Sequence, residues 1–299
     1  MHLLSRITLA SICLLSASQI ANAAGNADTI FYGGDIVTMN KSQPAAEAVA
    51  IQDGKIIQVG SLAKLKAVQG KDTKLVNLNG QTLMPGFVEP HVHIFGTAFS
   101  EELWQNMSNF EMPHDTLDSL VTKLTANSKN VKDGEWITAF GVDPSRTDPF
   151  VSTTKPIFVM NQSMHIAYVN HKALEMAGIT DSTPDPKGGR LLKDSKGRLT
   201  GVVYEVPAFY LFLKKMPVPN QNLIEQALAK VGQKMVRKGV TTSAEISLGA
   251  YLGIDKENAL LNDMTHSGKL PVRVRGYMYS NAYPLTNNSY KPGQGDDVL

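Results

Sequence analysis

The stretch 83–94, with the sequence LMPGFVEPHVHI, most constrains how this chain can fold. Its Pro-Gly pair is a turn signal, and the residues after it predict a buried strand followed by a loop. Successive side chains of a strand point to opposite faces, so Glu89, His91 and His93 share one face. Two imidazoles two positions apart lie about 7 Å apart along a strand, and a neutral imidazole offers a lone pair to a metal ion. The spacing therefore predicts His91 and His93 as metal ligands at the end of a strand.

The chain before this stretch predicts a small β-rich unit, residues 24–85. Asp-Gly at 53–54 and Asn-Gly at 79–80 each separate two apolar runs. Both positions of such a turn need a positive φ, so each pair predicts a two-residue hairpin. A Gly-Gly pair at 33–34 predicts a further turn, and residues 62–68 predict a short helix. Taken alone, this pattern indicates a generic β-sandwich that carries no chemistry.

From residue 86 onward, predicted strands alternate with predicted helices. Such alternation is typical of βα units that build a parallel sheet. The predicted strands are residues 136–141, 156–160, 240–246 and 271–279, and the predicted helices are residues 116–129, two helices capped by Asn170 and Asn220, and one that ends near Ser267. Residues 188–205 predict a β excursion among these units.

Residues 1–23 have the three parts of a secretory signal peptide. A short positive segment precedes a short apolar run, and Ala-Asn-Ala at 21–23 predicts cleavage after Ala23. A buried N-terminal helix is the weaker interpretation. The single cysteine, Cys13, lies in this segment, so the mature chain is expected to depend on its core rather than on disulfides. We expect a periplasmic or secreted protein.

Charge and motif content disfavour several classes of function. The formal net charge is +2 with a pI near 8.4, and the Lys and Arg residues are scattered, which disfavours nucleic acid and acidic membranes as partners. The mature chain lacks a cysteine nucleophile, a Gly-x-Ser-x-Gly elbow, a P-loop and a His-Glu-x-x-His helix. Metal-assisted hydrolysis is the mechanism that remains, and zinc is the divalent ion that suits imidazole ligands.

The stretch 83–94 resembles the Pro-Gly-Phe-Ile-Asp-x-His-x-His signature of the metal-dependent amidohydrolase superfamily. More narrowly, it resembles the YtcJ-like branch, amidohydrolase family 3. Residues 161–179, 197–205 and 239–245 are similar to further segments of that branch. The resemblance extends over residues 28–299, which is essentially the whole mature chain.

This resemblance implies a fold and an activity. The fold is of the α/β class: a partial TIM-type (β/α) barrel over residues 86–299, with five or six strands, preceded over residues 24–85 by part of a small β-sandwich that C-terminal strands complete. The implied activity is metal-dependent hydrolysis of a C–N bond, in an amide or cyclic amide of a small molecule, by a metal-activated water.

The resemblance also implies roles for individual residues. His165 lies in a segment similar to the family motif Ser-Gly-His-x-x-x-x-Asn, and Glu205 ends a segment similar to Gly-Val-Leu-x-Glu, so both are predicted to bind substrate. From the residues alone, His165 could equally be a structural loop residue, and Glu205 could cap a helix N-terminus. Glu89 stands where the family usually has Asp, and it suits either catalysis or the orientation of a ligand histidine. Weaker candidates are Glu245, after a predicted strand, and Trp104 and Phe110, as pocket walls.

A catalytic zinc site needs about three protein ligands, and His91 and His93 supply two. The resemblance implies that the remaining ligands and a general-base Asp lie beyond Leu299, so we expect the N-terminal portion of a longer enzyme. The rival interpretation is a catalytically inactive fragment that at most binds metal or a partner, because unpaired strand edges favour association. A periplasmic binding protein is disfavoured, since it would leave the two histidines unexplained. Expected partners are a small-molecule substrate, with no nucleic acid and no membrane after signal removal; homo-oligomer formation stays open.

Overall fold

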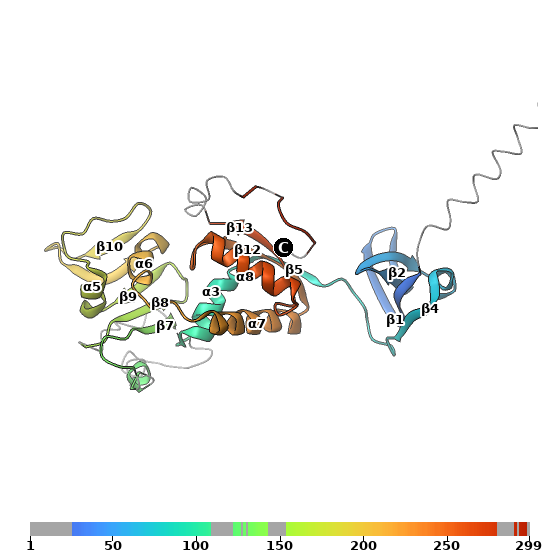
Figure 1. Ribbon diagram of the computed structural model, residues 1–299, viewed down its shortest axis with the longest axis horizontal. Coiled ribbons are helices and arrows are strands. Elements are labelled where there is room, and N and C mark those ends of the chain that lie inside the picture. Colours follow the sequence, from blue (N-terminus) through green and yellow to red (C-terminus); the bar gives the residue numbers. More distant parts are fainter. Residues whose placement is uncertain are drawn as a thin grey trace, which may run out of the picture. The chain divides into compact units, whose positions relative to one another are not determined.

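The computed structural model describes residues 26–108, 122–126, 128–129, 131–142, 154–279, 290–291 and 293–297. The chain divides into two compact units, Met1–Gly86 and Phe87–Leu299, and each is described by itself (Figure 1). The predicted signal peptide, residues 1–23, lies outside the described residues and stays a prediction. Among the described residues, no helix combines the length and the apolar character needed to cross a bilayer.

The first unit is built on one four-stranded sheet with the order β3-β2-β1-β4. Its strands are β1 (Ala27–Asn40), β2 (Gln43–Gln52), β3 (Lys55–Gly60) and β4 (Gln69–Asn77). The predicted hairpin at Asp53 and Gly54 is confirmed, since both residues have positive φ and β2 pairs with β3 in antiparallel orientation. The predicted helix is also confirmed, as α2 (Leu62–Leu65) continued by one turn of 3-10 helix.

The second predicted hairpin is wrong. Asn79 and Gly80 do form a turn with positive φ, but β4 runs parallel to β1, and the residues that follow the turn make a parallel bridge from Leu83 to Ile36 instead of an antiparallel strand beside β4. The predicted turn at Gly33 is also absent, because β1 continues through it with a shift in register. The two misread pairs are connected: the N–H of Gly80 donates to the Gly33 carbonyl at 2.8 Å, so the later turn follows the irregularity in β1 instead of reversing the chain.

The second unit contains a three-stranded parallel sheet with the order β13-β12-β5. Its strands are β5 (Phe87–Val92), β12 (Val240–Leu248) and β13 (Arg273–Met278). The helices α3 (Ile94–Thr97), α7 (Gln221–Arg237) and α8 (Ile254–His266) pack against it around one apolar core (Figure 1). Asn220 caps α7, and the buried residues of that helix repeat at helical spacing, as predicted.

The prediction that β5 is a buried strand followed by a loop is wrong. Phe87 and Val88 are 54% and 66% exposed, because β5 pairs with β12 only and its other side has no neighbouring strand among the described residues. Pro90 is tolerated on this strand because it has no N–H to donate, and it lies where the pairing with β12 shifts register. The chain then turns directly into α3 after His93.

A second sheet of the same unit has six strands in the order β10-β11-β9-β8-β7-β6. These are β6 (Gln105–Asn106), β7 (Ile137–Val142), β8 (Ile157–Asn161), β9 (Ile166–Val169), β10 (Arg190–Lys193) and β11 (Leu199–Tyr204), accompanied by α5 (His171–Ala177) and α6 (Val206–Leu213). Asn170 caps α5 as predicted, accepting a hydrogen bond from the N–H of Ala173. Of the helix predicted at residues 116–129, the described residues 122–126 are helical.

This second sheet corrects the expected strand count. The strands predicted at 136–141 and 156–160 exist as β7 and β8, but they belong to the six-stranded sheet and not to the sheet of β5. The reason is that β7 pairs in parallel with both β6 and β8, and the short connection after β8 then returns the chain antiparallel as β9, so these strands have their partners within this sheet. The described residues thus bring three strands, not five or six, into the parallel sheet that begins at β5.

Candidate metal centre and adjoining cavities

The two histidines of β5 contact each other as the period of a strand predicts. The ring centroids of His91 and His93 lie 5.6 Å apart, with the ring planes nearly perpendicular. His91 is exposed and His93 is half-buried at the carboxyl end of β5. In parallel sheets, the carboxyl ends of strands are where ligand sites form.

His93 is held in a polar setting that keeps its ring neutral. Its Nδ1 lies 2.8 Å from the hydroxyl of Ser247, which is the penultimate residue of β12. Burial lowers the pKa of His93, and the nearby His91 and His165 lower it further, against an opposing effect of Glu245. A neutral imidazole retains the lone pair that a metal ion needs.

Glu245 is the residue whose importance the sequence analysis underestimated. It is fully buried on β12, and its carboxylate accepts hydrogen bonds from the N–H and the hydroxyl of Ser247, both at 2.8 Å, and from the N–H of Phe95 at 3.2 Å. No ion pair to it forms within the described residues. The available signal was the recurrence of polar residues at 243, 245 and 247 on one face of the strand, between the apolar residues 244, 246 and 248.

The interpretation that Glu89 orients a ligand histidine finds no support in its contacts. Its carboxylate accepts a hydrogen bond from the backbone N–H of His91 at 3.2 Å, not from a ring nitrogen. That contact stabilises the main chain near the end of β5 and leaves the His91 ring without a carboxylate partner among the described contacts.

His165 and Glu205 form a second polar pair. His165 Nδ1 lies 3.0 Å from Glu205 Oε2, and the N–H of Glu205 donates to the His165 carbonyl at the same distance. The side chains are 69% and 47% exposed. Glu205 occupies the N-cap position of α6 but makes no side-chain capping bond, so the capping interpretation is wrong.

The backbone of Glu205 is strained. Its φ of 68° and ψ of 154° lie in a region that is essentially restricted to glycine and costs about 1–3 kcal/mol for other residues. Met164, where the family motif has glycine, also has a positive φ of 62°. Such strain clusters at functional sites, so the connection between β8 and β9, with Met164, and the junction of β11 and α6, with Glu205, are both candidate functional segments.

Two loops approach Gly96, which lies in α3 three residues after His93. A Cβ atom added there would lie 2.6 Å from the Tyr251 hydroxyl, 3.0 Å from Cε of Met164 and 3.1 Å from Cβ of His93. The segment carrying His165 and the loop after β12 therefore both reach the end of β5. The structure brings His91, His93, His165 and the unexpected Glu245 into one neighbourhood, and Glu205 joins it through His165.

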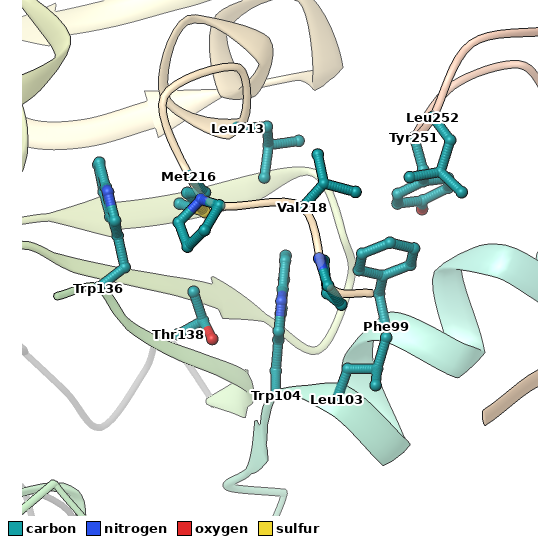
Figure 2. Close-up of a pocket in the computed structure, with 12 residues that line it drawn as sticks. Phe99, Leu103, Trp104, Trp136, Thr138, Leu213, Met216, Val218, Tyr251 and Leu252 are labelled. Atoms are coloured by element: carbon teal, nitrogen blue, oxygen red, sulfur yellow. The ribbon is translucent and has the colours of Figure 1, made fainter. Parts of the chain in front are cut away.

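Two cavities adjoin this neighbourhood. The smaller one, about 160 Å³, is walled by aromatic and aliphatic side chains, including Phe99, Trp104, Trp136 and Tyr251 (Figure 2). Trp104, which was predicted to wall the substrate pocket, lines this cavity, and its contact with substrate stays a prediction, whereas Phe110 lies outside the described residues. The larger cavity, about 560 Å³, shares Tyr251 with it and continues past α6 toward α8. The predicted metal ligands His91 and His93 and the predicted substrate-binding residues His165 and Glu205 line neither cavity.

The loop that separates β12 from α8 is held by Glu257. This buried carboxylate accepts hydrogen bonds from the N–H groups of Gly249, Tyr251 and Leu252, at 2.5, 2.7 and 2.6 Å. Burial raises the pKa of Glu257 to about 7, although the three donors lower it. Burial also raises the pKa of Tyr251, with the neighbouring carboxylates of Glu245 and Glu257 adding to the effect.

The donor set fits a divalent cation in part. Two imidazoles suit a transition ion, and the buried Glu245 carboxylate beside them has no cationic side chain in an ion pair within the described residues. Those residues contain no group of three or more His, Cys, Asp or Glu side chains that could hold a metal ion. The site as described therefore offers two of about three expected ligands.

Comparison with known proteins identifies the family. Residues 74–297 match the family described as Amidohydrolase family, and the chain belongs to it. It is 29% identical over 255 residues to the protein YtcJ of Bacillus subtilis (strain 168), covering 82% of this chain and 47% of that protein. It is 26% identical over 191 residues to N-substituted formamide deformylase of Arthrobacter pascens, covering 60% of this chain and 35% of that enzyme. The chain thus spans less than half the length of these curated relatives.

A solved structure shares the fold. An uncharacterized metal-dependent hydrolase from Pyrococcus horikoshii OT3 aligns with a TM-score of 0.61 at 20% identity, over 87% of this chain and 50% of that one. A related hydrolase from Pyrococcus furiosus aligns with a TM-score of 0.59 at 16% identity. At this level of identity, the likeness concerns the mixed α/β fold.

Proposed function

We propose that this chain is the ligand-bearing N-terminal part of a metal-dependent hydrolase that cleaves a C–N bond, in an amide or cyclic amide of a small molecule. The observation that carries the proposal is the contact between His91 and His93 at the carboxyl end of β5, in a chain of the amidohydrolase family. We further propose that β5, β12 and β13 are the first strands of a TIM-type barrel, because they are parallel and connected through helices.

The proposed cofactor is a divalent metal ion, with zinc favoured by the imidazole ligands. His91 and His93 would be its first two ligands. When bound, such an ion supplies a water whose pKa falls to about 7 and polarises the scissile carbonyl. Burial lowers the pKa of His93, which favours the neutral ring that offers a lone pair. The remaining ligand and the general base are not among the groups that the described residues gather at the site.

His165 and Glu205 are proposed to bind the substrate. The pair is exposed, so it can exchange its solvent contacts for a ligand, and the segment that carries it reaches the end of β5 through Met164. Glu205 keeps an unfavourable backbone conformation without making a side-chain capping bond, as expected for a residue retained for contacts of its side chain with a ligand. The apolar walls of the adjoining cavities suit the uncharged part of a small organic amide.

The proposed cellular location and substrate class are based on the sequence. The segment 1–23 supports export to the periplasm or beyond, and the near-neutral net charge of +2 supports a small-molecule substrate over nucleic acid or a membrane surface. The exposed edge of β5, with Phe87 and Val88, supports association with further chain, whether in the same polypeptide or in a second copy.

A second candidate is a form of the protein without catalysis that binds metal or a partner at most. The observation favouring it is the pair of histidines without a third ligand among the described residues. Two imidazoles can retain a metal ion weakly, but a catalytic zinc site needs about three protein ligands and an open position.

Metal titration of the purified protein separates these candidates. We expect Zn²⁺ binding that His91→Ala abolishes, while His171→Ala, at an exposed histidine that begins α5, leaves it unchanged. Zinc-dependent hydrolysis within a panel of N-substituted formamides, acyl amides and cyclic amides would support the enzyme. Zinc binding without turnover would support the second candidate, and unchanged binding by His91→Ala would contradict both.

A further inference from the structure

A hydrogen-bonded path joins Glu245, Ser247 and His93. The hydroxyl of Ser247 lies 2.8 Å from Oε1 of Glu245 and 2.8 Å from Nδ1 of His93. Glu245 is fully buried and Ser247 is nearly so, which shields the path from water. The two ends are far apart in sequence, since His93 and Ser247 are separated by 154 positions, so the contact depends on the pairing of β5 with β12.

The donors and acceptors along this path determine which group carries each hydrogen. All three groups that meet the Glu245 carboxylate are donors: two N–H groups and the Ser247 hydroxyl. A carboxylate with only donors around it acts as an acceptor, so the hydroxyl hydrogen of Ser247 points to Glu245. The Ser247 oxygen then presents a lone pair to His93, and the partner hydrogen must come from His93 Nδ1.

We propose that Glu245 and Ser247 are positioning residues that hold His93 as its Nδ1–H tautomer and leave Nε2 as the metal-binding atom. The role of this tautomer in metal binding rests on the proposed function, whereas the tautomer itself does not depend on a bound metal. A partner on the second ring nitrogen is what fixes the tautomer and orientation of a ligating histidine. Here the acceptor for His93 Nδ1–H is the Ser247 hydroxyl, which in turn donates to the Glu245 carboxylate, so Glu245 acts on the ring without contacting it.

The same carboxylate also fixes the main chain next to His93. Oε2 of Glu245 accepts a hydrogen bond from the N–H of Phe95, two residues beyond His93, at 3.2 Å. The carbonyl of His93 accepts the first helical bond of this turn, from the N–H of Thr97 at 2.7 Å. Glu245 thus controls both the ring of His93, through Ser247, and the turn from β5 into α3. Its removal should disturb His93 more than the removal of Ser247.

The strand provides a matched control at Ser243. Ser243 lies on β12 four positions before Ser247 and is 1% exposed, yet its hydroxyl has no hydrogen-bond partner within the described part of the chain. Ser243→Ala therefore removes a buried hydroxyl from the same strand without touching the path. Ser247→Thr is the conservative counterpart, because threonine keeps an oxygen that can both donate and accept.

The tautomer can be read directly in the metal-free protein by ¹⁵N nuclear magnetic resonance of the imidazole nitrogens, with His93 assigned by the signal missing in His93→Gln. We expect a single Nδ1–H form in the wild type, in Ser243→Ala and in Ser247→Thr. Ser247→Ala and Glu245→Gln should show the Nε2–H form or a mixture. Circular dichroism melting of Ser247→Ala against Ser243→Ala checks that both remain folded. An unchanged tautomer in Ser247→Ala, or an Nε2–H form in the wild type, would overturn the proposal.

Zinc affinity, measured by competition with a chromogenic chelator, gives a second readout. Loss of an outer partner typically weakens metal binding by 10–100-fold, so Ser247→Ala should bind Zn²⁺ at least about tenfold more weakly, with Ser247→Thr close to the wild type. Equal affinities across Ser247→Ala and Ser243→Ala would contradict a positioning role. A wild type that binds no Zn²⁺ but shows the Nδ1–H form would refute the proposed function and leave the positioning of His93 standing.

Discussion

Two carboxylate–histidine arrangements of the second unit differ mainly in their exposure to water. Glu245 reaches His93 indirectly, through Ser247, and is fully buried. Glu205 contacts His165 directly, yet both side chains are about half-exposed or more. Burial makes each hydrogen bond of Glu245 obligatory, because an unpaired buried donor carries a large penalty. The exposed pair competes with water and salt, so its contribution to stability is small. The buried arrangement is suited to fixing geometry, and the exposed one to meeting a ligand.

The largest expected effect on this comparison is that of Glu245→Ala. The substitution leaves the N–H groups of Phe95 and Ser247 and the Ser247 hydroxyl without their acceptor inside the protein. At about 1–3 kcal/mol for each unsatisfied group, we expect a loss of at least ~3 kcal/mol in the free energy of unfolding, measured in urea. Glu205→Ala, its exposed counterpart, should change the same quantity by less than about 1 kcal/mol. Similar losses in the two variants would show that burial does not distinguish the two carboxylates.

The pH dependence of stability sharpens the comparison with a third carboxylate. Burial raises the pKa of Glu257 to about 7, above its ordinary value of 4.5. Between these two values, the folded state binds more protons than the unfolded state. The contribution of Glu257 to the free energy of unfolding is therefore largest below pH 4.5 and falls as the pH rises to 7. A difference of about 2.5 in pKa corresponds to ~3 kcal/mol for this single group.

Urea denaturation between pH 4.5 and 7.5, compared in the wild type and Glu257→Gln, measures this effect. Glutamine cannot ionise, so the variant should lose most of the fall in stability that Glu257 causes, although its amide replaces one acceptor oxygen with a donor. Identical pH profiles in the two proteins would mean that the three N–H donors offset burial and that Glu257 stays ionised throughout the range.

What could be predicted from the sequence was local. The hairpin at Asp53 and the helices capped by Asn170 and Asn220 follow from signals within a few residues, and all three are confirmed. The turn at Asn79 was placed correctly, but its direction depends on the break in β1 more than forty residues earlier. Strand β8 was likewise found, and its sheet was not, because sheet membership depends on pairing with distant strands.

The same limit applies to the site. The contact of His91 with His93 follows from the two-residue period of a strand, which is visible in the sequence. Family motifs pointed to His165 and Glu205 as separate substrate-binding residues, and the contact between them was not predicted. Glu245 acquired its role because β12 pairs with β5 and places it beside residues 150 positions earlier. Metal binding by the histidines stays a prediction.

Glu205→Gly tests the strain in the exposed arrangement. Glycine adopts the φ and ψ of residue 205 without a steric penalty, and the backbone N–H of this residue still donates to the His165 carbonyl. Relief of about 1–3 kcal/mol is partly offset by the greater entropy of glycine in the unfolded chain, so we expect a net gain of about 1 kcal/mol. Thermal melting against Glu205→Ala, which retains the strain, isolates the backbone effect. A less stable glycine variant would mean that the Glu205 side chain stabilises the fold after all.

The smallest expected effect is that of His165→Ala. The His165 side chain is 69% exposed, and exposed pairs of this kind contribute about 0–1 kcal/mol. Because the backbone bond between residues 165 and 205 does not need the imidazole, we expect a change below about 0.5 kcal/mol in the free energy of unfolding. Urea denaturation at low and high salt provides the measurement. A loss above ~1 kcal/mol would make the exposed pair a structural element like the buried one, and the strain at Glu205 would then need a structural rather than a ligand-binding explanation.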